Sequence, residues 1–314
     1  MKFFQMNSGS WRKSRVFSRT VLFLYVVFTF GLAQSLYAGA WTLKKGQLWA
    51  KSSFFYQKTT KRYYSRNILC PLEHECHSSG QKVPFPFDGE SRFSALYLDL
   101  GYGVTDRLEL RVQIPYFDIE FTDLSNPLRP NSTGVGDVRF GFGYNFLSNP
   151  IVSTLQIRAK APTGFFNKES EVVPIGDGQW DLEFMGQFGK SLWPIAGYLN
   201  VDVGYRLRFA PDVETTTIEP GNEFFFRGEA GYSVLKNLLF KVALFGTYGE
   251  KIIQESLTIP DSQREILFFE PGVFLTIRKN IALESSVMFS LAGKNFPAGQ
   301  VFNFGLSYTF SLLQ

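Results

Sequence analysis

Apolar and polar residues alternate along most of the chain after residue 40. The clearest case is the segment 137–146, whose apolar face consists of Val138, Phe140, Phe142, Tyr144 and Phe146 and whose other face consists of Asp137, Arg139, Gly141, Gly143 and Asn145. A period of two places alternate side chains on opposite faces of an extended strand, whereas a helix needs a period of about 3.6. The pattern therefore predicts β-strands with one apolar and one polar face.

Twelve segments share this alternation, and each is about ten residues long or longer. They span residues 46–57, 92–103, 108–119, 136–147, 151–161, 178–190, 197–209, 222–234, 238–249, 265–278, 281–291 and 300–311. A strand that crosses a membrane at a tilt needs about 9 to 11 residues. The lengths of these segments therefore suit strands that span a bilayer.

The connections between the segments alternate between short and long. Short turns lie near Thr105-Asp106, Ser148-Asn149, Trp193-Pro194, Lys236-Asn237 and Lys279-Asn280, and longer polar connections separate them. Short turns in the periplasm and long loops outside are typical of bacterial outer-membrane barrels. We therefore expect both ends of the chain to be periplasmic and a long first extracellular loop at about residues 58–91.

Backbone groups inside a lipid bilayer must all be hydrogen-bonded within the protein, so a membrane-spanning sheet has to close on itself. We therefore predict an all-β fold, a closed antiparallel transmembrane β-barrel of twelve strands covering residues 41–314. The alternative is a secreted β-propeller, whose blades recur at about 40 to 45 residues. A propeller blade needs four short strands per repeat, whereas each repeat here contains two long ones.

The first forty residues have the features of an export signal. Five basic residues and no acid occupy residues 1–19, an apolar run follows from Val21 to Ala33, and Ala38-Gly39-Ala40 forms an A-x-A cleavage site before Trp41. The apolar run is shorter than the roughly 20 residues that a transmembrane helix needs, which disfavours that alternative. We expect residues 1–40 to be a signal peptide and the mature protein to be located in the bacterial outer membrane.

Composition supports this location and excludes one class of partner. Aromatic residues make up 17% of the chain, and a barrel wall displays such residues to lipid and in girdles at the membrane interfaces. Removing the five basic residues of the leader from the 32 in the chain leaves 27 against 28 acidic residues. No basic stripe remains that would bind nucleic acid.

The two cysteines and the two histidines lie together in the long first loop. The segment contains Cys70, His74, Cys76 and His77. Cysteine and histidine at short spacing can bind zinc, and a pair of free thiols is a further alternative. A disulfide between Cys70 and Cys76 is favoured because an exported pair in an exposed segment normally oxidises. We expect no metal and no cofactor.

No catalytic constellation is predicted. A barrel hydrolase needs a base that activates a nucleophile or a water, and histidine usually serves as this base. Neither histidine lies on a predicted strand or near a G-x-S-x-G motif. The sequence therefore favours a protein that is not an enzyme.

The inward faces of the fourth to eighth strands carry ten ionisable residues, which are the candidate site residues. They are Asp137, Arg139, Arg158, Lys160, Asp181, Glu183, Arg206, Arg208, Glu223 and Arg227. When the strands are folded as hairpins without offset, Asp137 lies opposite Lys160, Arg139 opposite Arg158, Arg158 opposite Asp181, Asp181 opposite Arg206, and Arg208 opposite Glu223. These residues could line a solute pathway or form an ion-pair lattice that only stabilises the barrel. A barrel of twelve strands is intermediate between filled small barrels and open porins, which favours a narrow passage.

Three motifs resemble strand-entry signatures of the outer-membrane barrels in the MetA-pathway phenol-degradation family. They are Gly134-x-Gly136-Asp137, the run from Gly176 to Asp181, and the turn GYGVTDRLEL at Gly101–Leu110. The resemblance covers most of the mature chain and implies a transporter-like barrel associated with aromatic or other hydrophobic compounds. The family supplies no catalytic residues to transfer, and the first loop with its two cysteines departs from it.

The function expected from these observations is an outer-membrane channel or transporter for small solutes. Its expected partners are outer-membrane lipid, the barrel-assembly machinery that recognises the aromatic last strand, and a small-molecule solute. One alternative is a scaffold or surface-interaction barrel that acts through its long first loop, because long loops often carry function. An outer-membrane enzyme is the less favoured alternative.

Overall fold

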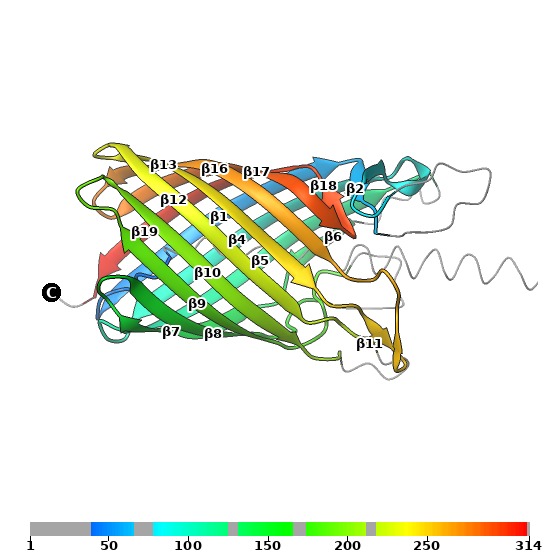
Figure 1. Ribbon diagram of the computed structural model, residues 1–314, viewed down its shortest axis with the longest axis horizontal. Coiled ribbons are helices and arrows are strands. Elements are labelled where there is room, and N and C mark those ends of the chain that lie inside the picture. Colours follow the sequence, from blue (N-terminus) through cyan, green and yellow to red (C-terminus); the bar gives the residue numbers. More distant parts are fainter. Residues whose placement is uncertain (1–38, 66–77, 125–130, 166–173, 212–217, 313–314) are drawn as a thin grey trace, which may run out of the picture.

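Twelve long antiparallel strands wind around a common axis in the part of the chain that the computed structural model describes, residues 39–65, 78–124, 131–165, 174–211 and 218–312 (Figure 1). These strands are β1 (Gln47–Thr59), β4 (Glu90–Gly103), β5 (Leu108–Thr122), β7 (Arg139–Leu147), β8 (Val152–Lys160), β9 (Asp181–Ser191), β10 (Gly197–Arg208), β12 (Glu223–Leu235), β13 (Leu238–Gly249), β16 (Glu265–Arg278), β17 (Ile281–Lys294) and β19 (Gln300–Ser311). These strands coincide with the alternating segments of the sequence, and the predicted boundaries agree closely with the observed ones.

The sheet closes into a barrel because its first and last strands pair. Each long strand pairs antiparallel with the next one along the chain, and β1 pairs with β19 from Gln47↔Ser311 to Gln57↔Val301. The predicted closed barrel of twelve strands is therefore confirmed, and the propeller is excluded. Among the described residues, no helix is long and apolar enough to cross a membrane.

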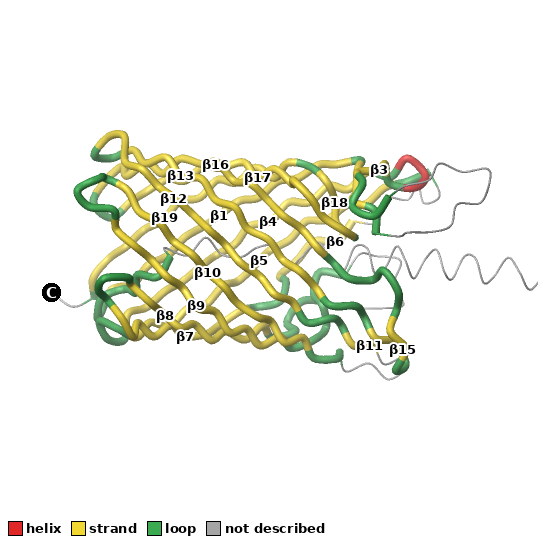
Figure 2. The backbone as a smooth tube through the Cα atoms, viewed as in Figure 1, coloured by secondary structure: helices red, strands yellow, loops and turns green. Residues whose placement is uncertain are grey.

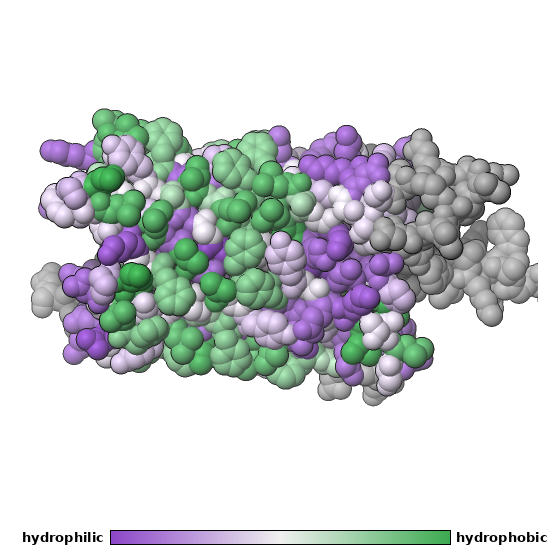
Figure 3. Space-filling model, in the orientation of Figure 1, coloured by the Kyte–Doolittle hydropathy of each residue, from purple (hydrophilic) through white to green (hydrophobic). Residues whose placement is uncertain are grey.

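Side chains alternate between the lumen and the outer surface. In β10, Asn200, Asp202 and Arg206 are buried, whereas the intervening Leu199 and Val201 are exposed. Figure 3 shows hydrophobic side chains gathered over the middle of the strands, with hydrophilic residues toward the end that carries β18 and β11. The outer surface therefore has the apolar band that lipid requires, and the polar side chains fill the interior.

The two ends of the barrel differ in their connections (Figure 2). At the short-turn end, connections such as 104–107 and 236–237 join the strands, and the first and last strands meet where the Leu312 N–H donates to the Gly46 carbonyl at 2.8 Å. At the long-loop end, the connections contain shorter elements, which sequence periodicity missed because each has only two to five residues. They are β2 (Lys61–Tyr63), β3 (Lys82–Pro84), η2 (Pro86–Asp88), β6 (Asn131–Val135), β11 (Ile218–Glu219), β14 (Ile253–Gln254), β15 (Leu257–Thr258) and β18 (Phe296–Ala298).

The strand predicted at 136–147 is interrupted at its start. Both β6 and β7 pair with β5, but residues 136–138 lie between them outside either strand. An added Cβ at Gly136 would lie 2.2 Å from the Phe117 ring, and the Gly136 N–H donates to the Pro115 carbonyl at 2.9 Å. Pro115 has no N–H to return a second bond, so regular pairing stops here. This break frees Asp137 from the strand.

Candidate functional site

All ten ionisable residues predicted from the sequence face the lumen. They lie on β7, β8, β9, β10 and β12 or, in the case of Asp137, directly before β7. Eight of them are buried, and Arg139 and Arg208 are partly buried. The alternation of the strands thus identified the lumenal side chains of this wall.

The predicted register of these strands was wrong by two residues. Lys160 lies opposite Arg139 rather than Asp137, and Arg158 lies opposite Glu183 rather than Asp181. The same offset changes the other three predicted pairs. Arg158 lies opposite Gly141 on β7 instead of Arg139, and Asp181 lies opposite Arg208 instead of Arg206. Glu223 lies opposite Arg206 instead of Arg208. Barrel strands are staggered by shear, and the long loops between some of them impose no register. Because the error is an even number of residues, every side chain still faces the lumen.

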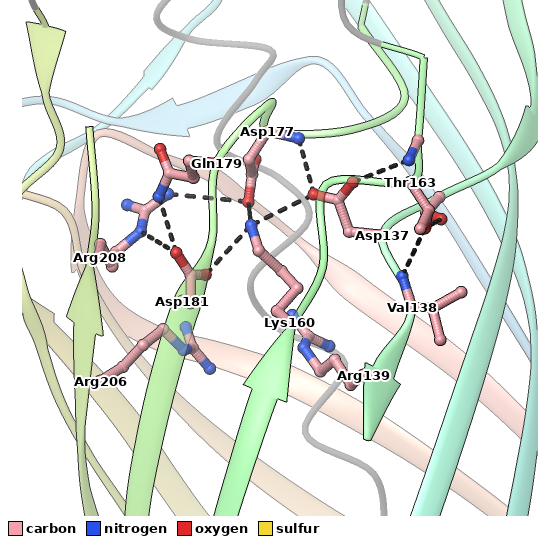
Figure 4. A network of polar contacts seen from close by, with 12 residues as sticks. Asp137, Val138, Arg139, Lys160, Thr163, Asp177, Gln179, Asp181, Arg206 and Arg208 are labelled. Atoms are coloured by element: carbon pink, nitrogen blue, oxygen red, sulfur yellow. Dashed lines mark hydrogen bonds and ion pairs between the residues drawn. The ribbon is translucent and has the colours of Figure 1, made fainter. Parts of the chain in front are cut away.

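Lys160 is the centre of a network at the long-loop end (Figure 4). Its ammonium lies 3.2 Å from Asp137, 3.1 Å from Asp181 and 2.5 Å from Asp177. Asp177 belongs to the β8–β9 connection, and sequence reasoning placed it in a motif without assigning it to the lumen. Burial disfavours its charged form, but Lys160 and Arg208 outweigh this effect and lower the pKa of the Asp177 carboxyl to about 2.

Asp137 joins the β8–β9 connection to the barrel wall. Its two carboxylate oxygens accept hydrogen bonds from the Gly164 N–H and the Asp177 N–H, each at 2.9 Å. Thr163 adds a second connection, because its hydroxyl donates to the Gly136 carbonyl at 3.0 Å and accepts from the Val138 N–H at 2.9 Å (Figure 4). The described residues of the β8–β9 connection, 161–165 and 174–180, are therefore held at the mouth of the lumen by the residues of the Gly134-x-Gly136-Asp137 motif.

Arginines and glutamates alternate below this network. Glu183 lies between Arg158 at 2.8 Å and Arg206 at 2.7 Å. Glu223 in turn contacts Arg206 and, at 3.5 Å, Arg208. Each acid thus shares two cations, which compensates part of the cost of removing these charges from water.

Charged pairs continue beyond the ten predicted residues, and most of the additional partners lie on β1, β13, β16 and β17. Arg227 lies 2.7 Å from Glu229 and 2.9 Å from Glu270, and Glu284 accepts ion pairs from both Lys51 and Lys241. The alternation on β1, β13, β16 and β17 placed these residues inward, so the same criterion could have found them. Charged residues therefore extend around the lumen rather than along one wall.

An aromatic cluster occupies the lumen beside the charged residues. Tyr97 contacts Phe55 and Phe117 edge-on, with ring centroids 5.3 Å and 5.7 Å apart, and Phe268 stacks on Phe245 at 5.2 Å. The buried members of this cluster are Phe55, Tyr63, Ala95, Tyr97, Phe117, Ile119, Ile175, Phe245, Ile266, Phe268, Met288, Phe296, Ala298 and Val301. The sequence did not reveal it, because apolar residues on both faces of a strand erase the alternation.

The aromatic cluster and the charged residues touch. The Arg227 guanidinium lies 5.2 Å from the centroid of the Phe245 ring, and that of Arg264 lies 5.3 Å from the Phe296 ring. Such contacts between a cation and a ring face are attractive. The lumen thus offers apolar and charged surfaces side by side.

The residues before β1 cross the lumen at the short-turn end. Ala40 is buried beside Asn200 of β10, whose side chain accepts a hydrogen bond from the Ala40 N–H at 3.0 Å. Three residues later, the Leu43 N–H donates to the Glu109 carboxylate of β5 at 2.9 Å. The segment 39–46 therefore lies across this end of the lumen.

The predicted disulfide lies outside the described part of the chain. Cys70 and Cys76, with His74 and His77, lie outside the described residues, so the disulfide stays a prediction. Within the described residues, no group of three or more histidine, cysteine, aspartate or glutamate side chains is arranged to hold a metal ion.

A family model places this barrel among known proteins. The model described as "Putative MetA-pathway of phenol degradation" matches residues 88–306, which is well over half of the chain. The chain belongs to this family. The resemblance seen in the three motifs is thereby confirmed, and the match includes all ten lumenal residues predicted from the sequence.

The chain is also similar to several solved structures. The COG4313 outer membrane channel from Pseudomonas putida is 18% identical, with a TM-score of 0.71, over 88% of this chain and 100% of that chain. The transport unit of the autotransporter AIDA-I from Escherichia coli is 6% identical, with a TM-score of 0.49, over 94% and 98% of the two chains. The CymD monoaromatic hydrocarbon channel is 9% identical, with a TM-score of 0.44, over 92% and 95%. The first of these likenesses, with 18% identity and a TM-score of 0.71, shows that the two chains share a fold. A search of curated protein sequences found no match to the chain.

Proposed function

We propose that this protein is a channel of the bacterial outer membrane through which small solutes pass, in particular aromatic or hydrophobic compounds that carry a polar end. The observation that carries this proposal is the division of the lumen between an aromatic cluster and a set of buried charged residues. A compound with an apolar ring and a polar group finds complementary partners for both parts in one passage. Membership of the phenol-degradation family and the fold of an outer-membrane channel support the proposal.

The charged residues are the basis for selectivity among solutes. A charge in a narrow passage acts at reduced dielectric and biases which ions enter. Of the ten residues assigned from the sequence, six are basic and four are acidic. These ten residues alone predict a mild preference for anionic or neutral polar solutes, or for the polar end of an aromatic acid. Lys51, Lys241, Asp177, Glu229, Glu270 and Glu284 bring the total to eight basic and eight acidic residues. We therefore expect any preference for anions to depend on the arginines of β10 rather than on the net charge of the lumen.

The aromatic cluster is tested by a pair of neighbouring phenylalanines on β16. Phe268 lies inside the lumen and is fully buried, whereas Phe269 lies on the outer surface. The variants Phe268→Ala and Phe269→Ala, reconstituted in liposomes, are compared for benzoate uptake and for conductance in potassium chloride. An aromatic contact contributes about 0.5–1.5 kcal/mol, so loss of the Phe268 ring should lower benzoate uptake about two- to ten-fold. Ion conductance should not fall, because truncation removes bulk from the lumen.

The Phe269→Ala variant should take up benzoate at the rate of the unchanged protein. Equal uptake by both variants, with both correctly folded by heat-dependent gel mobility, would contradict a solute pathway along the aromatic cluster. Absence of both uptake and conductance in the unchanged protein would reject the channel itself.

The charged residues are tested by replacing two arginines. Loss of Arg206 and Arg208 leaves Glu183, Glu223 and Asp181 with fewer cations, so the Arg206→Ser/Arg208→Ser variant should shift the reversal potential toward cation selectivity. The matched control is Lys236→Ser/Lys279→Ser, which removes the same charge from exposed short turns. A double variant that loses only thermal stability, with an unchanged reversal potential, would make the charges a structural lattice.

The scaffold alternative depends on the first loop. In its described part, the Tyr63 hydroxyl and the Lys82 ammonium both donate to the Ser290 carbonyl, at 2.9 Å and 3.1 Å. This part of the loop packs on the barrel mouth instead of standing away from it. The packing favours a role of the loop in shaping the channel entrance.

A further inference from the structure

Basic side chains gather at the short-turn end of the barrel. Among the described residues, the exposed charged side chains on the turns and strand ends of this side are seven cations and one acid. The cations are Lys44, Lys45, Arg107, Lys190, Lys236, Arg278 and Lys279, and the acid is Asp106. The Asp106 carboxylate accepts a hydrogen bond from the Lys45 N–H at 3.0 Å. The surface of this end therefore carries a strong positive charge.

The seven cations differ from those at the long-loop end in having no acidic partner. At the long-loop end, Lys58 lies 2.9 Å from the Glu90 carboxylate, and Arg92 forms an ion pair with Glu120. Within the described part of the chain, none of the seven cations at the short-turn end forms an ion pair. Their charges can therefore attract an anionic partner from outside the chain.

Lys190 places one of these charges on the lipid-facing side of the barrel. On β9, Phe184 and Phe188 are exposed on the outer surface, and Lys190 occupies the next outward position along the strand. Two residues of a strand span about 7 Å, so Lys190 lies just past the apolar band. Its ammonium donates one hydrogen bond to the Pro150 carbonyl at 3.0 Å. An ammonium has three protons, so Lys190 can donate to a further acceptor.

Exposed aromatic side chains accompany Lys190 at this end. Trp193, in the β9–β10 turn, is 85% exposed, and Tyr232 near the end of β12 is also exposed. The two connections are adjacent, because the Ser233 N–H donates to the Ala196 carbonyl at 2.7 Å. Tryptophan and tyrosine are enriched at the level of lipid headgroups, where one part of the ring system is apolar and the other polar. These residues therefore mark the headgroup level of the membrane.

Cations without acidic partners, next to interfacial aromatic residues, match the headgroups of anionic lipids. The short-turn end is expected to face the periplasm, and the outer-membrane leaflet on that side consists of phospholipids. We infer that the basic short-turn end, with Lys190 at its lipid-facing edge, is a binding surface for anionic phospholipids. The lipid phosphate accepts a hydrogen bond from the Lys190 ammonium, and the bound lipids anchor this end of the barrel at the membrane surface.

The inference is independent of the solute that passes, and β9 carries a matched pair of reporters for it. Trp193 follows this strand at the short-turn end, and Trp180, which is 50% exposed, precedes it at the long-loop end. Two forms of the mature protein each keep one of these tryptophans and have phenylalanine at the other tryptophan positions. They are placed in nanodiscs of phosphatidylcholine with a minor fraction of phosphatidylglycerol. One lipid or the other is brominated at the same mole fraction, and bromine quenches a tryptophan beside it.

Brominated phosphatidylglycerol should quench Trp193 more strongly than brominated phosphatidylcholine, whereas the two lipids should quench Trp180 equally. A cation near an anionic lipid contributes up to about five-fold in binding, so the preference at Trp193 should be about two- to five-fold. Salt at about 1 M shortens the Debye length to about 3 Å and should abolish it. Lys190→Gln should lower the preference, whereas Lys190→Arg, which keeps the charge, should retain it.

Equal quenching of Trp193 by the two lipids would overturn the inference, and it is the result expected if this end bound an acidic periplasmic protein instead. A preference of the same size at Trp180, or one that persists in high salt, would also overturn it, because lipid binding would then not depend on the basic end. If Lys190→Gln fails to assemble, the two reporters and the salt series in chains that keep Lys190 decide the question.

Discussion

Single buried side chains hold together parts of this barrel that are distant in the sequence. Lys160 at the end of β8 forms ion pairs with Asp137, Asp177 and Asp181, which lie before β7, in the β8–β9 connection and at the start of β9. Three carboxylates this close would repel one another without the central cation. The position of the described β8–β9 residues therefore depends on this ammonium group together with the hydrogen bonds of Asp137 and Thr163.

Replacement of Lys160 by methionine is expected to destabilise the barrel by about 3–5 kcal/mol, because it leaves buried carboxylates without their partner. The matched control is Lys190→Met, since Lys190 is exposed and its ammonium donates a hydrogen bond to the Pro150 carbonyl at the surface. The control should change stability by less than about 0.5 kcal/mol. The measurement is the urea concentration at which the folded band disappears on a gel. Equal midpoints for the two variants would mean that the network contributes nothing.

At the scale of elements, residues near the strand ends hold the long connections to one another. Asn295, between β17 and β18, has a φ of 49° and donates to the Asp261 and Gln263 carbonyls at 2.7 Å and 2.8 Å. Its side-chain oxygen accepts a hydrogen bond from the Ser65 hydroxyl at 2.7 Å. One asparagine therefore joins three connections, which follow β1, β13 and β17.

Substitution of Asn295 by alanine should loosen these three connections together. It removes three hydrogen bonds, and alanine tolerates the left-handed backbone less well than asparagine. Amide hydrogen exchange in β3 and in residues 259–263 should become faster, corresponding to about 1–3 kcal/mol of lost local stability. Asn280→Ala, in a short turn at the other end, is the control and should leave these amides unchanged. Unaltered exchange in Asn295→Ala would show that the connections are held elsewhere.

The first connection also carries the cysteine pair, for which the sequence alone makes a prediction. Cys70 and Cys76 should form a disulfide in the exported protein, because the periplasm is oxidising and the pair lies in a polar loop. Mass spectrometry without reduction should find a chain two hydrogens lighter than the reduced form. Two free thiols or one bound zinc ion per chain would reject the prediction.

At the scale of the whole molecule, the asymmetry between the two barrel ends predicts its orientation in the membrane. The described parts of the long connections lie at one end, and both the start of β1 and the end of β19 lie at the other (Figure 1). Outer-membrane barrels insert with short turns in the periplasm. The end that carries β11, β14 and β15 should therefore face the outside of the cell.

Cysteine labelling of intact cells tests this orientation. In a chain with Cys70→Ser and Cys76→Ser, a membrane-impermeant thiol reagent should label Glu255→Cys, because Glu255 is exposed in the turn between β14 and β15. Lys279→Cys, in an exposed short turn, should react only after the cells are broken. Labelling of Lys279→Cys in intact cells would reverse the orientation.

The sequence by itself determined the strands, the number of strands and the direction of their side chains. An alternation of period two is a local property, so Arg158 and Glu183 could be placed in the lumen before any strand was paired. Closure followed from the requirement that every backbone group in lipid be hydrogen-bonded. Family membership was accessible as well, because its motifs are short and continuous.

Only the tertiary structure decided which lumenal residues meet. The shear of the barrel moved the partner of Arg158 from Asp181 to Glu183, and no local pattern encodes shear. The aromatic cluster formed where β4, β13 and β16 carry apolar residues inward, a feature that alternation cannot detect. The position of Ala40 in the lumen required Asn200 and Thr154, which are more than a hundred residues away in the chain. The period and polarity of side chains are local properties of each strand, whereas strand register and contacts in the lumen arise only when twelve strands close around one axis.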